Sequence, residues 1–67
     1  MNYLIEFRQH NELKNENPIQ FVASTTNEFK EGTADGGRWL LDQKKKCAAQ
    51  MELKERDLII VKVIKLS

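Results

Sequence analysis

The 67-residue sequence predicts a small α+β domain of ββαβ order, with a three-stranded antiparallel sheet ordered 2-1-3 and one helix packed on one face. Three observations lead to this class. Two N-terminal segments alternate between apolar and polar residues, as half-buried strands do. A longer segment without Pro or Gly has a helical composition. The C-terminal LIIVKVIKL is the most strand-like segment, and the length fits a single domain over residues 1–67.

Alternation defines the first two strands, Asn2–Gln9 and Ile19–Ser24. Pro18 stands just before the second strand, where its missing N–H does not interrupt a ladder. A hairpin of these two strands is the simplest pairing. The sides expected to face the core are Tyr3, Ile5 and Phe7 in the first strand, and Ile19, Phe21 and Ala23 in the second.

Thr25–Gly37 has no clear periodicity. Thr25 and Glu28 have the spacing of a capping box, which favours one helical turn around Phe29. Asp35 is placed to cap the helix that follows. The competing interpretation is a turn at Asp35–Gly37 followed by a strand over Arg38–Asp42.

The helix is predicted from Arg38 to about Lys54. At about 100° per residue, its apolar side chains form a stripe roughly 120° wide, suited to packing on a sheet. Trp39 falls outside this stripe, beside Gln43 and Gln50. The stripe consists of Leu40, Leu41, Cys47, Ala48 and Met51, interrupted by Lys44.

The last strand, Leu58–Leu66, is apolar on both sides. Ile59, Val61 and Val63 are predicted to face the helix. The opposite side would then lie on an uncovered face, which is typical of a contact with a second copy or another protein. In the alternative, Thr25–Gly37 folds over this face. The residues predicted on the uncovered face are Leu4, Val22, Leu58, Ile60, Ile64 and Leu66.

The composition argues against several function classes. One cysteine and one histidine allow neither an internal disulfide nor a Cys/His metal site within one chain. His10 has no evident nucleophile beside it, and Cys47 is expected to be a buried small hydrophobe. Asp35-Gly36-Gly37 lacks the known phosphate-loop patterns. We therefore expect no enzyme activity, no cofactor and no metal.

The location follows from the same kind of observation. The longest apolar run is four residues, far below the roughly 20 of a membrane helix. Glu6 and Arg8 stand where a secretory signal needs an apolar core. With a single cysteine, these features predict a cytoplasmic protein that does not enter a membrane.

The remaining hypothesis is a non-catalytic protein-binding module, an inhibitor or adaptor. Tryptophan is frequent among interface hot spots, so the predicted partner site is Trp39 with Arg38, Lys46 and Gln50. In size and lack of catalytic residues the chain resembles the small inhibitors of phages and mobile elements, some of which block host nucleases or CRISPR complexes. Residues 37–67 hold eight Lys/Arg against four Asp/Glu, so the alternative is an accessory nucleic-acid-binding domain using Arg38, Lys45, Lys46 and Lys54.

Overall fold

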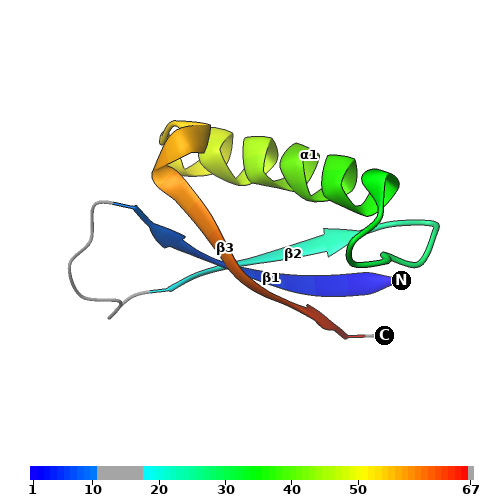
Figure 1. Cartoon of the computed structure of the whole chain (residues 1–67). Helices are drawn as coiled ribbons and strands as arrows, with labels where there is room; N and C mark the ends of the chain where they lie inside the picture. Colours follow the sequence, from blue (N-terminus) through cyan, green and yellow to red (C-terminus); the bar gives the residue numbers. More distant parts are fainter. Residues whose placement is uncertain (11–17, 67) are drawn as a thin grey trace.

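The computed structural model describes residues 1–10 and 18–66. Its sheet is antiparallel with strand order β2-β1-β3, and one helix lies along one side of it (Figure 1). The predicted class and strand order are confirmed, and Arg38–Asp42 is helical. In the part of the chain described, no helix is long and apolar enough to cross a membrane. The elements are β1 (Asn2–Gln9), β2 (Ile19–Ser24), α1 (Ala34–Met51), the short 3-10 turn η1 (Glu55–Asp57) and β3 (Leu58–Lys65).

The pairing of β1 with β3 contains a β-bulge at Val61. Ile5 lies opposite Val63 and Glu6 opposite Lys62, but the next residue, Phe7, lies opposite Ile60. Val61 therefore has no opposite residue in β1. Because side chains alternate along a strand, one added residue exchanges the two sides of β3 beyond that point.

The bulge corrects the predicted faces of the last strand. Leu58 is only 1% exposed and belongs to the core, and Ile60 packs against that core. Their predicted place on the uncovered face is wrong. Val61, predicted to face the helix, is exposed. Ile59 lies opposite Arg8 and faces away from the helix as well.

The core lies between one face of the sheet and α1. The buried stripe of α1 is rotated toward Trp39, which packs against the core together with Leu40. Leu41 and Met51, predicted to be in the stripe, are 58% and 48% exposed, so their predicted burial is wrong. The buried core residues are Tyr3, Ile5, Phe7, Ala23, Cys47, Ala48 and Leu58, and the buried helix residues also include Gly36 and Gln43.

Both ends of α1 differ from the prediction. Thr33, not Asp35, caps the helix, because its Oγ1 accepts from the Gly36 N–H at 3.0 Å. At the other end Glu52 adopts a left-handed conformation (φ 57°) and closes the helix. The Leu53 N–H then bonds the Ala48 carbonyl at 2.9 Å, and the Leu53 side chain packs against the core.

Candidate interaction surface

Trp39 belongs to a cluster of three aromatic rings on the helix side of the sheet. Its ring centroid lies 5.4 Å from that of Tyr3 and 5.3 Å from that of Phe29, and the Tyr3 and Phe29 centroids are 5.9 Å apart. The Tyr3 hydroxyl accepts a hydrogen bond from the Phe29 N–H at 2.9 Å. Trp39 is half-buried and packs against the segment before the helix. With Phe29 and Thr33 it also lines an open hollow of about 630 Å³.

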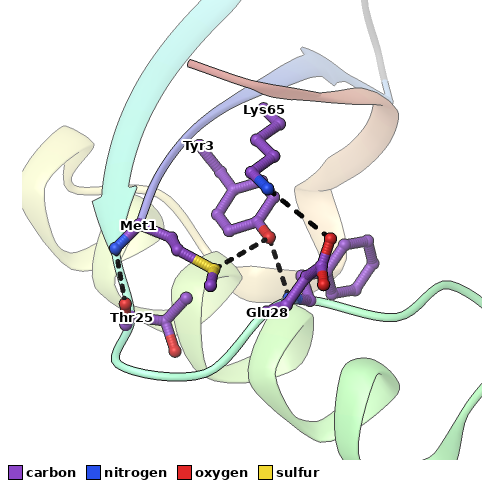
Figure 2. Close-up of polar contacts among 6 residues, drawn as sticks. Met1, Tyr3, Thr25, Glu28 and Lys65 are labelled. Atoms are coloured by element: carbon purple, nitrogen blue, oxygen red, sulfur yellow. Dashed lines mark hydrogen bonds and ion pairs between the residues drawn. The ribbon is translucent and has the colours of Figure 1, made fainter. Parts of the chain in front are cut away.

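The segment Thr25–Gly37 is held on the helix side, so it does not cover the opposite face of the sheet. Phe29 makes its contacts with Tyr3 and Trp39, and Glu28 forms an ion pair with Lys65 at 3.5 Å. Figure 2 shows this pair, together with the Met1 ammonium, which donates to the Thr25 carbonyl at 2.9 Å. Thr25 accepts from the Asn27 N–H and starts no helical turn, so the predicted turn around Phe29 is wrong.

The other residues of the predicted partner site are exposed on α1. Arg38, Lys46 and Gln50 all project into solvent, and Lys46 forms an exposed ion pair with Asp42 at 3.3 Å. Lys45 and Lys54, named for nucleic-acid contacts, are exposed too, but Lys54 lies beyond the end of the helix. Asp42 therefore reduces the positive charge on this surface, and the Trp39 ring packs against Tyr3 and Phe29.

The side of the sheet opposite α1 carries a continuous line of apolar side chains. We call this side the open face. In the register of the sheet, Leu4 lies directly opposite Val22 of β2 and directly opposite Ile64 of β3. These three residues form the apolar row. Val22 is 60% exposed and Ile64 40%. Leu66, also exposed, follows the last residue of β3 and extends the row there.

Polar side chains border the apolar row on both sides. Toward the chain start, the Ser24 hydroxyl donates to Asn2 Oδ1 at 2.7 Å. On the other side, Glu6 lies opposite Gln20 and Lys62, and Arg8 follows. The open face therefore has an apolar centre and a border with two positive charges and one negative charge, in which Ile59 lies opposite Arg8. This arrangement of apolar centre and polar rim is the usual anatomy of a protein interface.

The nucleophile and base candidates are not assembled into a site. Cys47 is 1% exposed, and desolvation by burial raises the pKa of its thiol, which keeps it protonated and weakly nucleophilic. His10 is exposed at the end of β1, where its backbone N–H donates to the Asp57 carbonyl at 2.7 Å. Within residues 1–10 and 18–66, no three His, Cys, Asp or Glu side chains gather as metal ligands would.

The sequence alone places all four side chains of the apolar row and its extension on the uncovered side of the sheet. These residues, Leu4, Val22, Ile64 and Leu66, alternate along their strands with residues of the core. It does not identify Phe29, whose contacts with β1 and α1 keep the segment before the helix away from that side.

Comparisons of this chain with known protein families, with curated proteins and with solved structures found no match.

Proposed function

We propose that this chain is a non-catalytic protein-binding module, an inhibitor or adaptor, that binds its partner through the open face. The apolar row carries the proposal. Exposed apolar surface is worth about 25 cal/mol per Å² when it is removed from water, and Val22, Leu4 and Ile64 lie side by side in one line. An inhibitor or adaptor acts by occupying a surface, so it requires shape and burial and no reacting group.

The open face also indicates the chemistry of the partner. Arg8 and Lys62 border the apolar row on the side where only Glu6 is acidic. The complementary surface is therefore a protein with an apolar centre flanked by acidic side chains. The buried, protonated Cys47 thiol is compatible with a reducing cytoplasm as the place of action.

Two matched substitutions test the proposed surface. Ile64→Glu places a negative charge in the apolar row, and Leu41→Glu places the same charge on the exposed side of α1. Proteins retained by each tagged variant from an extract of the expressing cells are quantified, and circular dichroism verifies folding. We expect proteins that the wild type and Leu41→Glu retain and that Ile64→Glu loses. Equal retention by all three, or loss with Leu41→Glu alone, contradicts the proposal.

The nucleic-acid alternative has weaker support, since Asp42 pairs with Lys46 within the basic surface. It predicts binding that falls steeply as salt is raised, because Lys and Arg displace counterions from phosphates. Fluorescence anisotropy with labelled DNA and RNA at low and high salt measures this directly. We expect no salt-dependent binding, and a steep dependence that Lys45→Gln weakens would instead establish the alternative.

A further inference from the structure

The hydrogen bonds at the start of the sheet show which backbone groups of β2 face its free edge. Met1 and Thr25 exchange two hydrogen bonds, from the Met1 ammonium to the Thr25 carbonyl (2.9 Å) and from the Thr25 N–H to the Met1 carbonyl (3.0 Å). Antiparallel ladders alternate between pairs that exchange such bonds and pairs that do not. Ala23 and Phe21 therefore bond to β1. The residues between them and beside them direct their N–H and C=O groups away from β1: Gln20, Val22 and Ser24.

β2 lacks the features that usually prevent another strand from pairing with an edge. The six residues Ile19–Ser24 contain no charged side chain, no proline and no bulge. The opposite edge strand, β3, has a bulge at Val61 and the charges of Lys62 and Lys65. In the described part of the chain, the backbone of β2 has no hydrogen-bond partner other than β1.

We propose that a second copy of this chain pairs with this edge, β2 against β2, antiparallel about a two-fold axis at Val22. In that register Val22 lies opposite the second copy's Val22, and Gln20 lies opposite the second copy's Ser24. All the backbone groups directed to the edge then form hydrogen bonds between the copies. On the helix side, Phe21 lies opposite the second copy's Ala23.

The composition of β2 selects both the occupant and the register. Because the strand has no charge, two copies meet without like-charge repulsion, and the two-fold axis places apolar beside apolar and polar beside polar. A shift to an axis at Phe21 would set Gln20 against the second copy's Val22. It would also set Ser24 against the second copy's Pro18, which has no N–H to donate.

The pairing also covers the most exposed large hydrophobic side chain of the described residues, Val22. Its cross-strand neighbour in the dimer is another β-branched side chain, which is a favourable pair in a sheet. The apolar row then runs unbroken from Ile64 of one copy to the second copy's Ile64. Oligomerisation is one of the usual ways in which a chain of this size supplements a small core. This inference does not depend on the proposed function.

Substitutions at Val22 test the interface with little effect on the fold. Val22→Pro removes an N–H that faces the edge and leaves the bonds of Phe21 and Ala23 to β1 in place; proline is accepted on such edge strands. Val22→Lys sets two positive charges against each other across the axis. Val22→Thr is the control, because it keeps both the N–H and the branched side chain.

Sedimentation equilibrium over a concentration series gives the mass of each variant, with circular dichroism as the test of folding. We expect wild type and Val22→Thr to rise from the 7.8 kDa chain mass to twice that value. We expect Val22→Pro and Val22→Lys to stay at the chain mass at concentrations where the wild type is mostly dimeric. A wild type that remains monomeric at its solubility limit overturns the proposal, as does a folded Val22→Pro that dimerises like the wild type.

Amide hydrogen exchange by NMR provides a second measurement that identifies the interface. The Val22 and Ser24 amides should exchange at least ten times more slowly at high concentration than at low concentration, while the Phe21 and Ala23 amides remain protected throughout. Concentration-independent exchange at Val22 in a dimeric sample places the interface elsewhere and refutes the pairing. Ile64→Glu leaves this edge unchanged and should dimerise normally, so failure of the open-face proposal is distinguishable from failure of this one.

Discussion

Two adjacent glycines in the first turn of α1 provide a matched pair of substitutions with opposite expected effects. A Cβ added at Gly36 would overlap the Lys30 carbonyl oxygen and would lie 2.9 Å from Thr33 Oγ1 and 3.1 Å from Phe29 Cε2. A Cβ added at Gly37 would meet nothing within 4 Å. We therefore expect Gly36→Ala to destabilise the fold and Gly37→Ala to stabilise it.

The magnitudes follow from two opposing effects. Alanine in place of glycine in a helix contributes about 0.5–1 kcal/mol, and Gly37→Ala should gain this amount. At Gly36 this gain is opposed by the overlap with the Lys30 backbone carbonyl. That carbonyl has little room to move, because it also accepts a hydrogen bond from the Thr33 hydroxyl at 2.7 Å. Overpacking of this kind costs about 1–3 kcal/mol. The net loss for Gly36→Ala is then roughly 0–2.5 kcal/mol, so this variant should be about 1–3 kcal/mol less stable than Gly37→Ala.

Urea unfolding followed by Trp39 fluorescence measures both variants with one probe, since Trp39 packs on Phe29 close to the altered contact. For a domain of this size, each kcal/mol corresponds to about 4–8 °C in Tm, so thermal unfolding should rank them in the same order. Equal stability of Gly36→Ala and Gly37→Ala would refute the reasoning, since it would mean that the segment before the helix does not press against Gly36.

Four further substitutions, in three experiments, test other parts of the fold by urea unfolding. Tyr3→Phe removes the acceptor of the Phe29 N–H and should cost about 1–2 kcal/mol; a loss near zero would show that this bond does not fix the segment. Leu58→Ala should cost about 2–5 kcal/mol and Ile64→Ala far less, and the reverse order would disprove the bulge. Burial raises the pKa of the Cys47 thiol above its ordinary value of 9.0, so the stability that this group contributes is fully present below that pH and is lost as the pH rises through and above it. The wild type should therefore lose stability more steeply than Cys47→Ala above that pH, and parallel pH profiles would contradict this.

The first two strands were predictable because every second residue is apolar, from Tyr3 to Phe7 in the first and from Ile19 to Ala23 in the second. β3 was not predictable in the same way. Its sequence is apolar on both sides, so either set of side chains satisfies the expectation of a core face, and nothing in LIIVKVIKL shows that Val61 is an added residue. The bulge then decides that Leu58 and Ile60 face the helix.

The rotation of α1 had a similar cause. Leu41 and Trp39 are both large and apolar, and periodicity alone favours the stripe that contains Leu41. The structure favours Trp39 because rings from β1 and from the segment before the helix, Tyr3 and Phe29, pack against it. Such long-range aromatic contacts leave no trace in the spacing of residues along the helix.

The bulge at Val61 decides which side chains of β3 the core confines and which can change freely. Leu58 is confined by the volume of the core, whereas Ile64 and Leu66 are 40% and 51% exposed on the open face. A library randomised at 62, 64 and 66 should consequently yield mostly folded proteins, and one randomised at 58, 60 and 63 very few. One strand can thus keep the fold with the side chains on its helix face, while those on its open face are free to acquire new binding specificities.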